Sequence, residues 1–213
     1  MKYIIEEAVQ IPMYDIQVTG DLHIPEEAKG IVVFSHGSGS SRLSPRNRFV
    51  ASKFENKKLG TLLFDLLTEE EDQIYENRFN INLLMQRLLK VTKWLQNQKE
   101  IRELSIGYFG ASTGAASALM AAAELGEDIK AVVSRGGRPD LAIPVMPKVK
   151  APTLLIIGSL DYGVIELNQE AFDTLKTIKK LAVVTGATHL FEEEGKLEEV
   201  ANLATDWFNL YLE

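Results

Sequence analysis

Three residues in the second half of the chain have the types and placing that nucleophilic catalysis needs. Ser112 lies in Gly110-Ala-Ser-Thr-Gly114, a match to G-x-S-x-G, where a serine occupies a sharp turn between a strand and a helix. The two glycines have no Cβ, so the strand and the helix can approach closely. The stretch therefore predicts an exposed serine nucleophile. The alternative is a glycine-rich turn in which Ser112 only caps the following helix.

A serine nucleophile needs a base within reach and a group that orients the base. Asp161 and His189 each follow a short apolar run that predicts a buried strand. Because ligands meet an open parallel sheet at the carboxyl ends of its strands, we expect these side chains to converge with Ser112. His189 is then the general base, and Asp161 fixes its tautomer. The alternatives are a turn aspartate with Glu166 or Asp140 as the acid, and a loop histidine.

Backbone donors for a developing oxyanion are expected at two places. Thr113 follows the nucleophile and should supply one N–H group. The second should come from the loop His36-Gly-Ser-Gly39, where Ser38 is our choice because the flanking glycines allow a tight turn. We expect His36 to hold this loop by hydrogen bonds and not to act as the base.

Five arginines lie near the expected site, namely Arg42, Arg46, Arg48, Arg135 and Arg138. Arg42 and Arg138 are the candidates for binding a substrate carboxylate or phosphate, since a guanidinium matches such groups with two hydrogen bonds. The interpretation that we favour for these arginines is structural. In that case they pair with Asp65, with Asp140 or with loop carbonyls.

The elements that must position these residues alternate between strand and helix. Residues 2–24 predict an antiparallel hairpin, and from residue 30 onward short apolar runs alternate with amphipathic segments. This pattern predicts an α/β fold, with a mainly parallel twisted sheet covered by helices on both faces. We expect one domain over residues 1–213. Helices are predicted at 45–59, 75–98, 113–125, 167–178 and 196–212, and the acidic run 69–72 is predicted to be a solvated loop.

Composition excludes several classes of function. The 213 residues include 46% hydrophobic and 25% charged residues, as is typical of a globular protein. A net charge of −7 disfavours a nucleic-acid partner, which would need a basic face. No run approaches the length of a membrane span. With no cysteine and three histidines, the chain has no disulfide or thiolate site, and we expect no metal or cofactor and a cytoplasmic location.

Four stretches together resemble the dienelactone hydrolase-related group of α/β hydrolases, in which the triad follows the chain order Ser, Asp, His. They are Phe34-Ser-His-Gly-Ser-Gly-Ser-Ser-Arg-Leu-Ser-Pro-Arg-Asn, Gly110-Ala-Ser-Thr-Gly, Ser134-Arg-Gly-Gly-Arg-Pro-Asp and Thr188-His-Leu-Phe-Glu-Glu. The resemblance covers nearly the whole chain. It implies an α/β-hydrolase fold without a large lid domain.

One departure from that family changes the expected activity. Dienelactone hydrolases proper use a cysteine nucleophile, and Ser112 stands at that position here. The resemblance therefore indicates a serine esterase acting on a small ester or lactone. We expect a monomer or small homo-oligomer. A non-catalytic binding protein on the same fold and an acyltransferase remain the alternatives.

Overall fold

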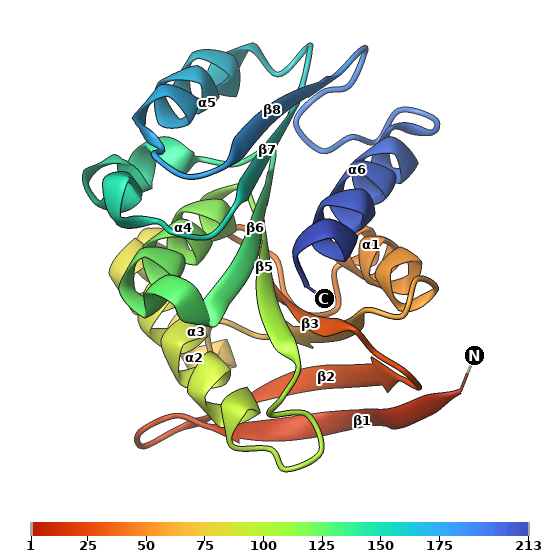
Figure 1. Ribbon diagram of the computed structural model, residues 1–213. Helices are drawn as coiled ribbons and strands as arrows, with labels where there is room; N and C mark the ends of the chain where they lie inside the picture. Colours follow the sequence, from red (N-terminus) through yellow and green to blue (C-terminus); the bar gives the residue numbers. More distant parts are fainter. Residues whose placement is uncertain (1, 213) are drawn as a thin grey trace.

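The computed structural model describes residues 2–212. Its core is an eight-stranded sheet with the strand order β1-β2-β4-β3-β5-β6-β7-β8 (Figure 1). The first two strands, β1 (Tyr3–Pro12) and β2 (Gln17–Pro25), form the expected antiparallel hairpin, and β2 also pairs antiparallel with β4. The hairpin thus forms one edge of the sheet.

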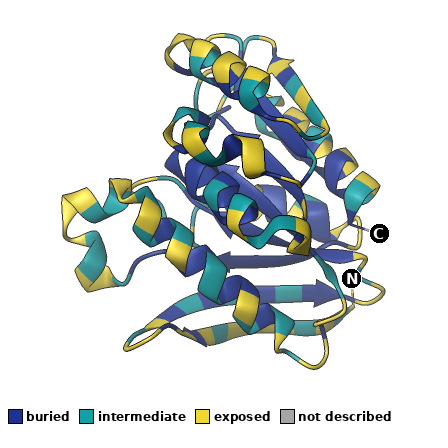
Figure 2. Ribbon diagram, turned by 60° about the vertical axis from the view of Figure 1, so that its left-hand side comes forward, coloured by how far each residue is buried: buried dark blue, intermediate teal, exposed yellow. Residues whose placement is uncertain are grey.

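The other six strands run parallel to one another. They are β3 (Gly30–Ser35), β4 (Gly60–Phe64), β5 (Ser105–Ala111), β6 (Ile129–Arg135), β7 (Thr153–Gly158) and β8 (Lys179–Val184). Every residue of β3, β4 and β7 is buried, which explains why their sequences are apolar without alternation. The central strands appear mostly dark blue in Figure 2, whereas the helices around them and the N-terminal hairpin also show teal and yellow.

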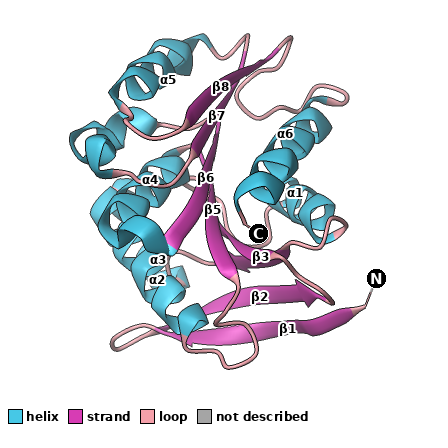
Figure 3. Cartoon of the chain, in the orientation of Figure 1, coloured by secondary structure: helices cyan, strands magenta, loops and turns pink. Residues whose placement is uncertain are grey.

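Helices cover both faces of the sheet, as predicted (Figure 3). On one face lie α1 (Pro45–Glu55) and α6 (Lys196–Tyr211), which pack on a core around Phe54, Phe109 and Phe208. On the other lie α3 (Ile81–Gln96), α4 (Thr113–Leu125) and α5 (Tyr162–Thr174). The alanine-rich α4 is buried along most of its length because small side chains let it lie close to the sheet.

The acidic run and the helix predicted at 75–98 are corrected by the structure. Glu69–Asp72 forms a short helix, α2, because Thr68 and Glu71 make a reciprocal capping box. The predicted long helix is instead a 3₁₀ helix, η1 (Tyr75–Phe79), followed by α3. Asn80 separates the two because its side chain accepts from Leu83 N–H and starts α3 afresh.

A third correction concerns the segment after β7. Helix α5 begins at Tyr162, directly after Asp161, and not at residue 167. The composition of Ser159-Leu-Asp-Tyr-Gly163 indicated a turn, and this turn proves to be very short. Smaller 3₁₀ helices, η2 (Gly126–Asp128) and η3 (Pro139–Lys148), flank β6. The β6–β7 connection therefore carries η3 and, within its described residues, no lid domain. Of the helices described, none combines the length and apolarity of a transmembrane segment.

Candidate active site

Ser112 occupies the turn between β5 and α4 with an unusual backbone conformation. Its φ of 51° and ψ of −122° lie in a region that residues with a side chain rarely adopt, at a cost of about 1–3 kcal/mol. The residues two positions before and after Ser112 must be glycine. A Cβ on Gly110 would lie 2.5 Å from Ala115 Cα, and one on Gly114 would lie 2.1 Å from the Ser35 carbonyl oxygen. Strand, serine and helix are thus packed too closely for any other residues at 110 and 114.

The predicted base and acid contact each other across two neighbouring loops. His189 follows β8, Asp161 follows β7, and the distance from His189 Nδ1 to Asp161 Oδ2 is 2.7 Å. Asp161 is mostly buried, whereas the imidazole is partly exposed. The carboxylate therefore holds the proton on Nδ1 and leaves Nε2 able to accept one.

Ser112 and His189 line the same pocket, which has a volume of about 230 Å³. Among the described residues, no hydrogen bond joins Ser112 Oγ to the imidazole ring. Such catalytic contacts are often long or poorly aligned before substrate binds. The remaining lining residues come from the loop after β3, the start of α1, the ends of β5 and β6 and the loop after β8. Asp161 lies behind the imidazole and outside this lining.

The two residues expected to supply oxyanion donors contact each other, but their N–H groups are not equally free. Ser38 N–H donates to Thr113 Oγ1 at 2.9 Å, so this backbone donor is engaged by a side chain. Thr113 is the first residue of α4, where backbone N–H groups have no partner within the helix. A hole formed by both N–H groups therefore requires the Thr113 hydroxyl to rotate away.

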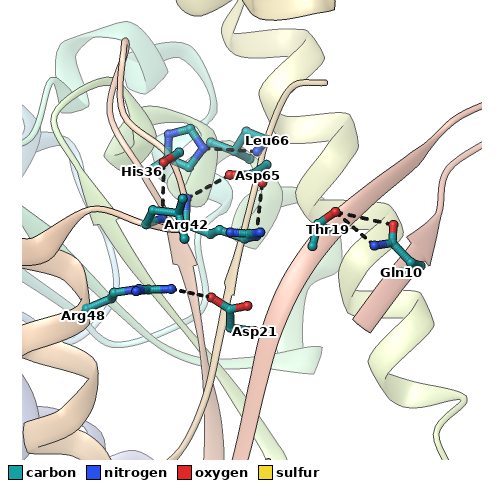
Figure 4. Close-up of polar contacts among 10 residues, drawn as sticks. Gln10, Thr19, Asp21, His36, Arg42, Arg48, Asp65 and Leu66 are labelled. Atoms are coloured by element: carbon teal, nitrogen blue, oxygen red, sulfur yellow. Dashed lines mark hydrogen bonds and ion pairs between the residues drawn. The ribbon is translucent and has the colours of Figure 1, made fainter. Parts of the chain in front are cut away.

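His36 holds the loop, as expected. Its Nε2 accepts from Leu66 N–H at 3.1 Å, and its Nδ1 lies 3.0 Å from the Gly37 carbonyl oxygen (Figure 4). Because Nε2 is an acceptor, the proton sits on Nδ1 and the ring is neutral. Burial lowers the pKa of His36 and keeps it in this form.

Arg42 and Arg138, the expected substrate-binding arginines, both face carboxylates. Arg42 Nε lies 3.3 Å from Asp65 Oδ2 (Figure 4), and Arg138 binds Asp140 through two hydrogen bonds of 2.9 and 2.8 Å. Neither residue lines the Ser112 pocket. Arg42 instead lines a separate hollow of about 390 Å³ that contains neither Ser112 nor His189. The structural interpretation therefore holds for these two.

The arginines that do line the Ser112 pocket are Arg46 and Arg135. Arg46 lies in the first turn of α1 and pairs with Glu192 at 2.8 Å. Arg135 is the last residue of β6, and its Nη2 donates to Asn47 Oδ1 at 3.3 Å. The prediction that each arginine pairs with an aspartate or a loop carbonyl is wrong for both. One sequence feature could have placed Arg135 in this pocket. It ends the strand that lies next to β5, and Ser112 directly follows β5.

Known proteins resemble this chain in sequence and in fold. Two curated proteins, from two strains of Mycobacterium tuberculosis, are 55% identical over 203 residues, which is 95% of this chain. Both carry the name "Putative phosphoribosyl transferase". The chain spans about half, 46%, of their length.

A crystal structure of dienelactone hydrolase from Anabaena variabilis is 52% identical, covers 98% of each chain and has a TM-score of 0.95. An esterase from Pyrococcus furiosus has a TM-score of 0.80 at 20% identity, over 100% of this chain and 94% of its own, which establishes the fold alone. The model of the dienelactone hydrolase family matches residues 23–213. This family and its α/β-hydrolase fold support hydrolase activity. The chain belongs to the dienelactone hydrolase family.

Proposed function

We propose that this protein is a serine hydrolase that cleaves small carboxylic esters or lactones through an acyl-enzyme on Ser112. The observation that carries the proposal is the strained Ser112 turn, which shares one pocket with a histidine already oriented by a carboxylate. Serine hydrolases on this fold combine these parts at the carboxyl ends of the strands. The chain has no cysteine, so a thiol cannot take the nucleophile's place.

The proposed reaction has two halves. His189 Nε2 takes the proton from Ser112 Oγ as the oxygen attacks the ester carbonyl, and the electron pair of the carbonyl moves onto its oxygen. Thr113 N–H, and Ser38 N–H once the Thr113 hydroxyl has rotated, stabilise that oxyanion. The intermediate collapses to the acyl-enzyme, and the imidazolium protonates the leaving alkoxide. Water then attacks the acyl group by the same steps and frees the acid.

Asp161 is proposed to orient the base and to stabilise its protonated form. The 2.7 Å contact with Nδ1 fixes the imidazole tautomer, and the buried carboxylate offsets the positive charge that forms on the ring. A change at this position should therefore lower kcat while leaving the binding of substrate largely intact.

The name of the Mycobacterium tuberculosis relatives is not evidence for a second activity at this site. It describes whole proteins more than twice as long as the matched region, of which this chain spans 46%. Acyl transfer to an alcohol or amine in place of water would use the same acyl-enzyme. Analysis of the products formed with added acceptors separates transfer from hydrolysis.

Labelling with a fluorophosphonate probe tests the proposal, with mass spectrometry of the modified peptide. We expect wild-type protein to react at Ser112, Ser112→Ala not to react, and turnover of short acyl esters to fall at least about 10³-fold in that variant. Ser40→Ala is the matched control, because Ser40 lines the same pocket away from the turn. Equal labelling of Ser112→Ala, or an unreactive wild type that binds a ligand tightly, contradicts the proposal.

A further inference from the structure

The hollow of about 390 Å³ that contains Arg42 lies next to the Ser112 pocket and is lined mostly by residues with polar side chains. We call it the Arg42 hollow. Its walls come from the start of β2, the loops after β3 and β4, and helix α2. Ser40 lines both spaces, and its N–H donates to the Gly37 carbonyl oxygen at 3.2 Å. The tight turn from Gly37 to Ser40 therefore separates the hollow from the Ser112 pocket.

The Arg42 guanidinium has a partner for its charge but not for its hydrogen-bond donors. Its Nε lies 3.3 Å from Asp65 Oδ2, within ion-pair distance (Figure 4), yet this buried Nε is not aligned for a hydrogen bond and has no partner. Within residues 2–212, the hydrogen bond between the two residues comes from the backbone N–H of Arg42, 2.9 Å from Asp65 Oδ1. Because a guanidinium has five N–H donors, this one keeps unused donors at the wall of the hollow.

The carboxylates of the hollow are also largely compensated. Asp65 faces the guanidinium, and Asp72 pairs with Arg78 at 2.7 Å. Glu69 is the remaining charged side chain of the lining, and it is exposed, so water screens its charge. An ion of either sign would therefore gain little by entering this space.

Unused donors next to compensated carboxylates suit a neutral ligand that carries several hydroxyl groups. A hydroxyl both accepts and donates, so it can accept from Arg42 and donate to Asp65. Gln17 and Thr19 add polar groups from one face of β2, since side chains alternate along a strand. An apolar ligand would displace water from these groups without replacing its hydrogen bonds. At about 30 Å³ per water of the liquid, the volume equals about a dozen waters, enough for one sugar ring.

We propose that the Arg42 hollow binds the alcohol part of the substrate, and that this alcohol is a polyol such as a sugar. The inference rests on the proposed function and names its substrate class. With the ester carbonyl at Ser112, the alcohol part passes over the turn into the hollow, where Arg42, Asp65 and Gln17 contact its hydroxyl groups. The bond from the acyl carbon to the polyol oxygen breaks, that oxygen takes the proton of the His189 imidazolium, and the polyol leaves.

Paired acetate esters test the proposal by steady-state kinetics in a pH-stat. A methyl glucoside acetylated at its primary hydroxyl presents the polyol, and cyclohexylmethyl acetate presents a ring of the same size without hydroxyl groups. We expect wild type to prefer the glucoside ester at least about tenfold in kcat/KM, through KM, because two or three hydrogen bonds of ordinary strength give that ratio.

Variants of the hollow should reduce this preference. Arg42→Met should remove most of it. Arg42→Lys keeps a charge opposite Asp65 but loses the planar set of donors, so it should also lose most of the preference. Gln17→Leu changes an exposed residue and should lower the preference about two- to threefold without a risk to folding. The matched control is Arg48→Met, which removes an arginine that pairs with Asp21 outside the hollow and should leave the preference unchanged.

A binding measurement separates failure of this inference from failure of the proposed function. In the Ser112→Ala background, methyl glucoside without the acetyl group, at tenfold its Kd, should raise Tm by about 3–6 °C. Ser112→Ala/Arg42→Met should show only the small rise that sugars cause through their exclusion from protein surfaces. Binding without wild-type turnover contradicts only the hydrolase proposal. Equal rises in both backgrounds, turnover of the acetates without preference for the glucoside, or full preference in Arg42→Lys overturns the polyol site.

Discussion

The two ends of helix α1 differ in the number of hydrogen bonds made by the buried charged side chain at each end. The helix dipole disfavours the charge at each end. A carboxylate lies at the partly negative C-terminal end, and a guanidinium lies at the partly positive N-terminal end. At the C-terminal end, Glu55 accepts from three side chains: Tyr3, His23 and Thr61. At the N-terminal end, Arg135 contacts the neutral side chain of Asn47.

This difference separates stability from binding. The hydrogen bonds to Glu55 tie the hairpin and β4 to α1 and offset the cost of burying its charge. Among residues 2–212, nothing comparable offsets the burial of Arg135, so that end of the helix is less stable than its packing alone would make it. Sites that bind ligands commonly carry such a cost. The contrast indicates that Glu55 stabilises the fold, whereas the buried charge of Arg135 costs stability.

The largest effect is expected from Glu55→Ala. It removes the shared acceptor of three hydrogen bonds and should lower the free energy of unfolding by about 3 kcal/mol. Urea denaturation followed by circular dichroism measures the change. Glu198→Ala, which removes an exposed partner of Lys53, is the control and should change stability by less than about 0.5 kcal/mol. A loss below about 1 kcal/mol for Glu55→Ala would remove the contrast between the two ends.

Arg135→Met should act in the opposite direction. Replacing a buried, unpaired cation with an apolar side chain of similar length should raise the free energy of unfolding by about 1–2 kcal/mol, even after loss of the Asn47 contact. The same denaturation assay applies, with Arg48→Met as the exposed control. If Arg135→Met destabilises the protein by more than about 1 kcal/mol, the guanidinium is a structural group and the comparison fails.

Glu55 and its partners Tyr3, His23 and Thr61 form the Glu55 cluster. A smaller effect is expected from the pH dependence of the stability that this cluster provides. The hydrogen bond from His23 to Glu55 raises the pKa of His23 above 6.5, against the opposing effect of burial. Its contribution is therefore fully present below pH 6.5 and is lost as pH rises through the folded-state pKa. We expect His23→Gln to destabilise the protein by up to about 1 kcal/mol at pH 5.5 and by less at pH 8.5. An equal loss at both pH values would show that His23 acts without its charge.

At low pH, protonation of Glu55 ends the stabilisation that its hydrogen bonds with His23 provide. Burial would raise its pKa, but the hydrogen bonds from His23, Thr61 and Tyr3 outweigh it and lower the pKa below 4.5. The stability that this carboxylate provides is present above pH 4.5 and disappears as pH falls through the lowered pKa. The cluster is thus most stabilising between these two titrations.

The smallest effect is expected at an exposed ion pair in the last turn of the helix. Lys53 and Glu198 form an exposed pair at 2.6 Å that links α1 to α6. A double-mutant cycle with Lys53→Met and Glu198→Gln should give a coupling energy of about 0–0.5 kcal/mol, because water screens both charges. A coupling above about 1 kcal/mol would mean that exposure does not distinguish this pair from the Glu55 cluster.

Much of the fold was predictable because its signals are local. The N-terminal hairpin, the alternation of strands and helices and the tight turn around Ser112 follow from apolar periodicity and from glycines where no Cβ fits. Two of the predictions that were wrong depend on single side-chain contacts. The capping box of Thr68 starts a short helix where a loop was predicted, and the Asn80 cap divides a predicted helix in two. Composition alone does not reveal such hydrogen bonds.

The candidate site divides in the same way. The sequence alone determined which residue types stand at the strand ends, and so predicted Ser112, Asp161 and His189 as a group whose catalytic role stays a prediction. Only the tertiary structure decided which arginine lacks an acid. Arg135 and Asn47 are 88 residues apart in the chain, and Arg46 and Glu192 are 146 apart. Burial and Coulomb interactions act through space between distant segments, so no local pattern records which charges meet.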